Sequence, residues 1–303
     1  MLKRMRSFLV LVMLFIAVTM SAQVTTATMS GKVTAQDEPI IGATVVAVHE
    51  PSGTRYGTVT NVSGQFNLQG MRTGGPYKVE ISYVGYQTAI YKGINLLLGE
   101  NYVLNVSLKE SSELLDEVVV TASKESNMKS DRAGAIMNAN RDMINSTPTI
   151  SRSISDIMRL SPQGADVGNG FAVGGGNYRQ SFVTVDGAAF NNTFGLGGNL
   201  PANGSPISLD ALEQVTVAVT PFDVRQSGFT GGAINAVTRS GDNQFRGTAY
   251  MYFNNENLKG SKVDDYELLR SKAQYYTYGA SFGGPIIKDK LFFFVNGEYE
   301  DNV

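Results

Sequence analysis

The chain of 303 residues lacks cysteine and tryptophan, and His49 is its single histidine. Without cysteine it can form neither a disulfide framework nor a cysteine metal site. Catalysis by Ser-His-Asp or Cys-His groups and multi-histidine metal chemistry are nearly excluded, because each needs a well-placed imidazole. We therefore expect no catalytic residue, no metal site and no cofactor. We expect His49 to be a surface residue at the end of a strand.

An excess of positive charge is also absent, because the formal net charge is -2. The sequence therefore gives no sign of the basic face that nucleic acid requires. Beyond the N-terminus no stretch reaches the roughly 20 apolar residues of a membrane helix. If the protein meets a membrane, it must do so with β-strands.

The N-terminus has the pattern of a secretory signal peptide over residues 1–22. Lys3, Arg4 and Arg6 precede a short apolar core, Phe8–Val18, and small residues follow before Gln23. The core is too short to span a bilayer as a helix. We expect cleavage and export from the cytoplasm; an uncleaved anchor is the alternative.

Residues 23–109 are predicted to be all-β. Short alternating runs are separated by turn signals such as 51–53, 61–64 and 73–76, and about seven strands at this spacing indicate a sandwich. The motifs "SGKVTAQDEPIIGATVVAV", "GTVTNVSGQFNLQGM" and "YKVEISYVGYQT" resemble the carboxypeptidase-regulatory-like domain. That resemblance implies a transthyretin-like β-sandwich without an active site of its own.

Residues 110–130 are predicted to be a polar linker that contains one apolar run, "LDEVVVTA". Three interpretations stay open from the residues alone. The run is an ordinary buried strand, or part of a disordered linker, or a docking strand that completes the sheet of a partner. A docking strand is expected to be short, β-branched and flexibly tethered.

Residues 131–242 form a glycine-rich unit of α+β character. We expect a short helix over 151–160 with Ser153 as its cap, a strand over 181–185 that ends in Asp186-Gly187, and a second strand over 214–220.

Residues 243–303 alternate with period two in three segments, 244–254, 274–284 and 291–299. One face of each is rich in aromatic and apolar side chains, and a short connection over 285–290 joins the last two. The pattern favours the start of an outer-membrane β-barrel, although a soluble amphipathic hairpin gives the same signal per strand. The apolar face contains Phe245, Ala249, Met251, Phe253, Tyr276, Tyr278, Ala280, Phe282, Leu291, Phe293, Val295 and Tyr299.

The linker run resembles the TonB box of TonB-dependent outer-membrane receptors. "RQSFVTVDGAAFNN" and "ALEQVTVAVTPFDVRQSGFTGGAINAVTRSG" resemble their plug domain, and the closing motifs resemble the Oar-like branch found in Bacteroidetes. The resemblance implies TonB as a partner of Asp116, Glu117, Val118, Val119, Val120, Thr121 and Ala122. It implies a plug motif made of Asp186, Gly187, Gly228, Gly231, Gly232, Ala233 and Asn235.

The predicted class is therefore mainly β: a sandwich, an α+β plug, and the first strands of an incomplete transmembrane barrel. Such barrels need roughly 22 strands, so we expect the chain to be the N-terminal part of a receptor. Outer-membrane lipid and an unidentified transported ligand, such as a peptide or protein, are the other expected partners. A secreted or surface-attached adhesion protein without energy coupling is the alternative, and an enzyme is the least favoured interpretation.

Two further patterns carry less weight. The glycines of 173–178 lack the Gly-Lys-Ser/Thr of a phosphate loop. The carboxylates of Asp264-Asp265 and of Glu298, Glu300 and Asp301 could bind calcium, but we interpret them as solvated.

Overall fold

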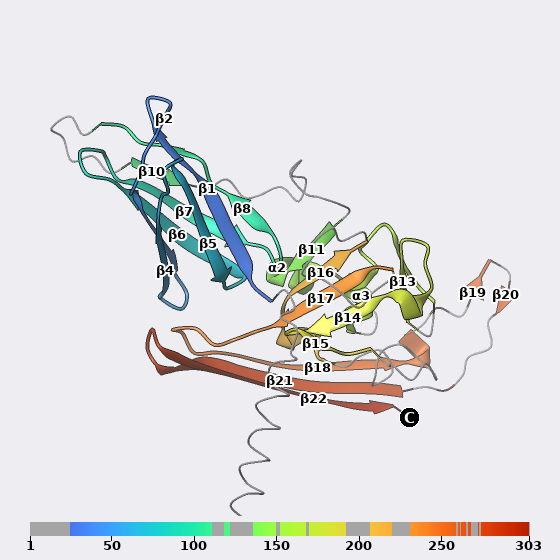
Figure 1. Ribbon diagram of the computed structural model, residues 1–303. Coiled ribbons are helices and arrows are strands. Elements are labelled where there is room, and N and C mark those ends of the chain that lie inside the picture. The colour runs from blue at the N-terminus through green and yellow to red at the C-terminus, as the bar shows by residue number, and fades with distance from the viewer. Residues whose placement is uncertain are drawn as a thin grey trace, which may run out of the picture.

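A computed structural model shows the chain as three bodies of β-structure (Figure 1). The predicted signal peptide, residues 1–22, lies outside the described residues. No helix in the described part is long and apolar enough to cross a bilayer. The structure describes residues 25–110, 118–121, 136–149, 152–167, 170–191, 207–219, 231–258, 260, 262–264, 266–267, 272 and 274–302.

The first body is a sandwich of two sheets. One sheet is built around β1 (Ala27–Ala35), which pairs with β2 (Glu38–Pro39), β5 (Gln65–Met71), β8 (Asn101–Val103) and β9 (Val106–Ser107). The other has the order β10-β7-β6-β3-β4, with β3 (Thr44–His49), β4 (Thr54–Val59), β6 (Gly74–Ser82), β7 (Ala89–Leu96) and β10 (Val118–Thr121).

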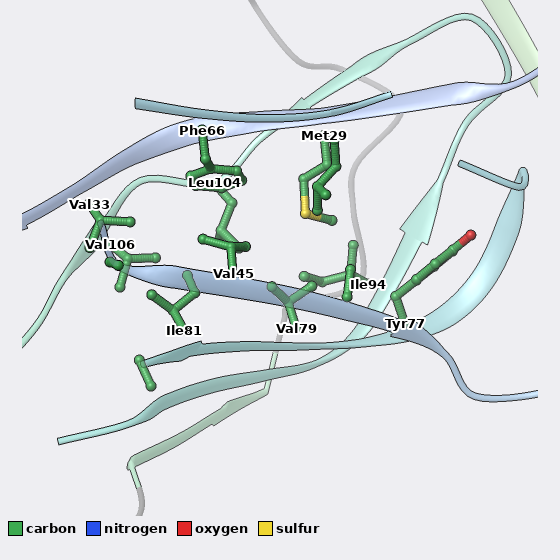
Figure 2. Close-up of a cluster of buried hydrophobic side chains, with 14 of the residues drawn as sticks. Met29, Val33, Val45, Phe66, Tyr77, Val79, Ile81, Ile94, Leu104 and Val106 are labelled. Atoms are coloured by element: carbon green, nitrogen blue, oxygen red, sulfur yellow. The ribbon is translucent and has the colours of Figure 1, made fainter. Parts of the chain in front are cut away.

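Alternate residues of the two sheets meet in one apolar core (Figure 2). Met29 and Phe66 of one sheet face Val45, Val79 and Ile81 of the other, and all are 4% exposed or less. A side chain buried in this way contributes about 1.5–3 kcal/mol relative to exposure. The period-two alternation of the sequence therefore orients the strands of both sheets.

The turn over residues 61–64 of the sandwich has the chemistry that its sequence predicts. The Asn61 side chain accepts hydrogen bonds from the backbone N–H groups of Ser63 and Gln65, each at 2.9 Å. Gly64 adopts a φ of 72°, where a Cβ would lie 2.6 Å from the Val33 carbonyl oxygen. The turn 61–64 therefore requires glycine both for its backbone angle and for space.

The second body, which we call the central unit, spans the described residues between 136 and 238. Its sheet has the order β11-β16-β17-β14-β15. The strands are β11 (Ile136–Asn140), β14 (Phe182–Val185), β15 (Ala188–Ala189), β16 (Leu212–Ala218) and β17 (Ala233–Thr238), and a separate hairpin joins β12 (Gly164–Asp166) to β13 (Phe171–Val173). The helices are α2 (Arg141–Ser146), α3 (Ile154–Met158), and the 3-10 turns η1 (Tyr178–Gln180) and η3 (Leu209–Ala211).

Helix α3 confirms the predicted apolar face. Ile154, Ile157 and Met158 are fully buried, and Ser153 is the N-cap residue. By contrast, β11 and α2 were not predicted, because "IMNAN" has no alternation and α2 is short. Asn140 begins α2 by accepting a hydrogen bond from the Met143 N–H at 2.9 Å.

The third body, which we call the strand sheet, has the order β18-β21-β22 and lies along one side of the central unit (Figure 1). Its strands are long and antiparallel, as predicted for the three alternating segments. They are β18 (Arg246–Asn255), β21 (Gln274–Ile287) and β22 (Leu291–Asn302); beyond β18 lie η4 (Glu256–Leu258) and the small pair β19 (Lys262–Val263) and β20 (Tyr266–Glu267).

The expectation of a mainly β chain is thus confirmed, and one expectation is wrong. His49 does end a strand, but it is only 3% exposed. Its ring packs 4.9 Å from that of Tyr77, and Nδ1 lies 2.7 Å from the Ser52 hydroxyl. Burial, with help from the nearby Arg72 cation, lowers the pKa of His49 to about 4. A single polar residue carries no sequence signal of this enclosure.

Candidate functional site

The valine segment, residues 116–122, is the predicted partner site, and its described part is β10. Val118 and Thr121 pair in parallel register with Ala89 and Lys92 of β7. β10 is the outermost strand of its sheet, and among the described residues no strand pairs with its other edge. Asp116, Glu117 and Ala122 lie outside the described residues.

This position corrects part of the expectation. Of the three interpretations left open, the disordered linker does not hold for residues 118–121, because they form a strand that pairs with the chain's own sandwich. Within the described part of the chain the segment is also not an interior strand, because it ends its sheet. The sequence does not reveal the pairing of β10 with β7, because which edge of β7 stays uncovered is decided by the strands that pair with it, and these are distant in the sequence.

The predicted plug motif is brought together around β14 and β17. Asp186 and Gly187 form the two-residue turn between β14 and β15, with φ values of 49° and 82°. Positive φ at both positions is the requirement of a type I′ turn. The Asp186 carboxylate accepts hydrogen bonds from the Thr238 N–H at 2.9 Å and from its hydroxyl at 2.6 Å. The turn is thereby attached to the end of β17.

The glycines that precede β17 allow close backbone approach. A Cβ on Gly232 would lie 2.5 Å from the Val173 side chain, and one on Gly231 would lie 3.1 Å from the Gln180 carbonyl oxygen. Ala233 begins β17, and Asn235 accepts a hydrogen bond from the Thr184 hydroxyl at 2.7 Å. Gly228 lies outside the described residues.

The strand sheet has two faces of opposite character. Met251, Phe282 and Val295 are 59%, 51% and 64% exposed, and strand register places all three on the same face. This is the face that alternation predicted to be apolar. On the opposite face Ser281 is 6% exposed and lies against the central unit. An apolar outer face with a polar inner face is the arrangement of outer-membrane strands.

Asp210 of η3 lies at the centre of the contact between the central unit and the strand sheet. Its carboxylate lies 2.8 Å from an Arg141 nitrogen and 3.7 Å from an Arg239 nitrogen, and it accepts a hydrogen bond from the Thr248 hydroxyl at 2.7 Å. Burial by itself would raise the pKa of Asp210, because it disfavours the charged carboxylate. Hydrogen bonds from Ser281, Thr248 and Arg141, with the charge of Arg141, outweigh it and hold the pKa below its usual value.

Arg141 fixes the geometry of this cluster. One of its nitrogens donates to the carbonyl oxygens of Leu209, Asp210 and Leu212 at 3.3, 3.2 and 2.9 Å. These residues include the last carbonyls before β16 begins, so α2 and β16 are held in one arrangement. Sequence reasoning missed this cluster, because Arg141 and Asp210 are 69 positions apart and nothing local marks either residue.

A second polar cluster lies further along the same contact. The Ser208 hydroxyl lies 2.9 Å from the Tyr250 hydroxyl and donates to the Glu298 carboxylate at 3.0 Å, and Tyr250 also donates to Glu298. Arg152 donates to the Tyr252 hydroxyl at 2.7 Å, and its guanidinium lies 4.3 Å from the centre of that ring. The two bodies are therefore joined largely by hydrogen bonds and charged groups.

The sandwich contacts the connection between β17 and β18, which in turn is bonded to the β21–β22 turn. Arg72 donates to the carbonyl oxygens of Ser240 and Gly241 at 3.3 and 3.4 Å. The Asn243 N–H donates to the Pro51 carbonyl at 3.0 Å, and the Asn243 side chain donates to the Asp289 carboxylate at 2.8 Å. The β3–β4 turn is thus attached to the β21–β22 turn.

These arrangements give no catalytic geometry within the described residues. The buried His49 faces Ser52 and Tyr77, and with its pKa lowered to about 4 it is neutral at pH 7. No group of three metal-ligating side chains occurs in the part of the chain that the structure describes. The arrangement is suited to holding three bodies together through polar contacts.

Two parts of the chain match known families. Residues 28–109 match the carboxypeptidase regulatory-like domain, and residues 237–302 match an outer membrane beta barrel domain. The first match covers nearly the whole described sandwich, and the second covers the strand sheet.

Curated relatives extend these matches. The chain is 31% identical over 151 residues to the TonB-dependent transporter Oar of Myxococcus xanthus, which covers 48% of this chain and 14% of that protein. It is 29% identical over 269 residues to the TonB-dependent receptor SusC of Bacteroides thetaiotaomicron. That alignment covers 84% of this chain and 24% of SusC. This chain therefore spans a quarter or less of the length of either relative.

Among solved structures, the siderophore receptor PirA from Acinetobacter baumannii aligns with a TM-score of 0.44 and 20% identity, over 55% of this chain and 24% of that one. The resemblance to TonB-dependent receptors that the sequence motifs indicate is confirmed by the two family matches and by the two curated relatives. They indicate an outer-membrane localisation for this chain.

Proposed function

We propose that this chain, an outer-membrane relative of the TonB-dependent transporters, contributes the TonB-binding segment, the plug and barrel strands of a TonB-dependent receptor. The periplasmic domain of TonB pairs with residues 116–122. Pulling on that segment remodels the central unit, which is the plug, and a path opens for a bound ligand. The sandwich lies in the periplasm.

The observation that carries this proposal is the polar contact between the central unit and the inner face of the strand sheet. A plug must be held inside a barrel and must also be released. Hydrogen bonds and ion pairs can be exchanged for water when the bodies separate, so each contributes only modestly to the net free energy of contact. The Asp210 and Tyr250 clusters have this character.

The TonB-binding role of the valine segment is supported by its form. β10 is a short strand at the end of a sheet, held there by backbone pairing with β7 on one side. An extended segment of this kind binds partners by adding to a sheet edge, where backbone hydrogen bonds give affinity. Three consecutive valines favour the extended conformation.

Outer-membrane lipid is proposed as a partner because large apolar side chains are exposed on the outer face of the strand sheet. The transported ligand is proposed to be large, such as a peptide or protein. It would approach from the side opposite the TonB segment.

The test is co-purification of the full chain, in detergent, with the periplasmic domain of TonB. Val119→Pro removes a backbone donor from the segment, so we expect it to abolish binding, whereas Val119→Ile keeps the donor and retains it. Undiminished binding by Val119→Pro would count against the assignment. Absence of binding by the unmodified chain would remove TonB coupling from the proposal altogether.

A further inference from the structure

The sandwich holds the valine segment through the edge of β7. Val118, Val119, Val120 and Thr121 are each registered with a residue of β7, from Ala89 to Lys92. The other edge of β7 is occupied by β6. Without β10, the backbone groups of β7 that face it would form an unpaired sheet edge, which proteins normally cover. The β7 edge is thus a built site for an added strand.

The chain also brings the segment back to this edge. The Gln87 N–H donates to the Lys109 carbonyl at 2.9 Å, and Tyr86 forms an isolated bridge with Glu110. The end of the sandwich therefore lies beside the residues that precede β7. Val118 follows Glu110 after seven residues, 111–117. A tether this short gives an effective local concentration on the order of millimolar.

From these contacts we propose that the β7 edge is a second binding site for the valine segment, and that it competes with the periplasmic domain of TonB. The inference rests on the proposed function, because it concerns the segment assigned there to TonB. A strand edge pairs with one strand at a time. TonB pairs with the edge of β10 that faces β7, and it must therefore displace the sandwich first.

Competition also decides where force is delivered. While β10 stays on β7, a pull on the segment loads the sandwich. The sandwich is attached to the β17–β18 connection through Arg72 and Pro51, and Asn243 of that connection is bonded to Asp289 in the β21–β22 turn. After release from β7, the same pull reaches the central unit through the chain that follows. The carboxypeptidase regulatory-like domain would in this way set how often the segment is available.

The expected weakening of TonB binding follows from the fraction of molecules in which the valine segment occupies the β7 edge. If only a fraction of molecules has the segment free, the apparent dissociation constant rises by the inverse of that fraction. An occupied-to-free ratio of about ten thus weakens capture roughly tenfold relative to a segment that is always free.

A disulfide that locks the pair gives the direct test. Lys92 and Thr121 are register partners, and neighbouring strands lie about 4.8 Å apart, within the Cα separation of a disulfide. The chain has no cysteine of its own, so Lys92→Cys with Thr121→Cys forms the only pair. Lys92→Cys with Val118→Cys is the matched control. Val118 is registered with Ala89, three positions from Lys92, so the two cysteines would be displaced by roughly 10 Å along the strands.

We expect the register pair, in the full chain in detergent, to cross-link in mild oxidant and the control pair to remain largely reduced. We expect the oxidised register pair to bind the periplasmic domain of TonB at least tenfold more weakly than the same variant after dithiothreitol. Comparison within one variant removes any effect of the substitutions themselves.

A second variant shifts the competition in the opposite direction. Lys92 lies in a bulge of β7, where no β6 residue is registered with it. Lys92→Pro therefore removes a donor next to Thr121 while sparing the β6–β7 ladder. We expect Lys92→Pro to bind TonB several-fold more tightly than Lys92→Ala, which keeps the N–H.

Each outcome has a distinct meaning. Equal cross-linking of the two cysteine pairs would overturn the β7 site. Cross-linking in register with unchanged TonB binding would overturn the competition, because TonB would then use the outer edge of β10. If the unmodified chain does not bind TonB at all, the proposed function fails and the competition fails with it, even where cross-linking still reports the β7 site.

Discussion

The Asp210 carboxylate accepts a hydrogen bond from the Thr248 hydroxyl at 2.7 Å, which links η3 of the central unit to β18 of the strand sheet. The same carboxylate forms an ion pair with Arg141 at 2.8 Å. One side chain therefore organises the inside of the central unit and its contact with the neighbouring strands.

Replacement of this carboxylate is expected to be costly. Asp210→Asn leaves the partly buried guanidinium groups of Arg141 and Arg239 without their shared counter-charge. Breaking a buried ion pair on one side costs about 3–5 kcal/mol, and we expect a loss near the lower value because Thr248 can still donate to the amide oxygen. Urea unfolding of the detergent-solubilised chain measures it. Glu38→Gln, at an exposed carboxylate of β2, is the control, and an equal effect of both changes would contradict the role of Asp210.

The sandwich is expected to lose stability in mild acid because of His49. The pKa of His49 falls from 6.5 to about 4 on folding, so the unfolded chain binds a proton that the folded chain excludes between those values. Stability from this group is complete above pH 6.5 and decreases as the pH falls towards 4, by about 3 kcal/mol in total. Urea midpoints at pH 7.5, 6, 5 and 4, followed by tyrosine fluorescence, test this. A His49→Gln variant should show a smaller decrease, and an identical pH profile would exclude His49 as the cause.

Gly232 is expected to tolerate no side chain. A Cβ there would lie 2.5 Å from the Val173 side chain, so Gly232→Ala forces β13 and β17 apart. Overpacking of this kind costs about 1–3 kcal/mol. Gly297→Ala, where nothing lies within 4 Å of the added carbon, is the matched control. Equal midpoints for the two variants in a urea titration would refute the close-packing argument.

The outer face of the strand sheet is expected to reject charge. Val295 is 64% exposed on the apolar face, and a cation on the lipid face of an outer-membrane strand costs about 2–4 kcal/mol near the bilayer centre. We expect Val295→Arg to reduce the amount of protein recovered in the outer-membrane fraction, and Val295→Leu to leave it unchanged. Full recovery of Val295→Arg would place this face away from lipid.

The sequence predicts well what repeats locally. The three strands of the strand sheet and the division of their faces follow from period-two alternation, and the structure places Met251, Phe282 and Val295 on one face as expected. The turns at Asn61 and Asp186 follow from residues that accept positive φ or cap their own backbone. Each of these features is decided by neighbours within a few positions.

What the sequence could not predict depends on distant partners. The burial of His49 requires Tyr77 and Ser52 around it, and the Asp210 cluster joins residues from five separate segments. The pairing of β10 with β7 depends on which edge of β7 is left uncovered by β6. The valine run is compatible with a strand, but its local pattern does not identify the neighbouring strand.

The hydrogen bond from Asn243 to Asp289 also determines sidedness. Asn243 also donates its backbone N–H to the Pro51 carbonyl of the sandwich, so in the proposed receptor the sandwich and the turn between β21 and β22 emerge from the same surface of the bilayer. Since β18 and β21 are antiparallel and are registered end to end, Asn255 and Gln274 emerge from the opposite surface. A water-soluble label that reaches only one surface should therefore modify either the turn at 288–290 or the ends at 255 and 274, never both at once.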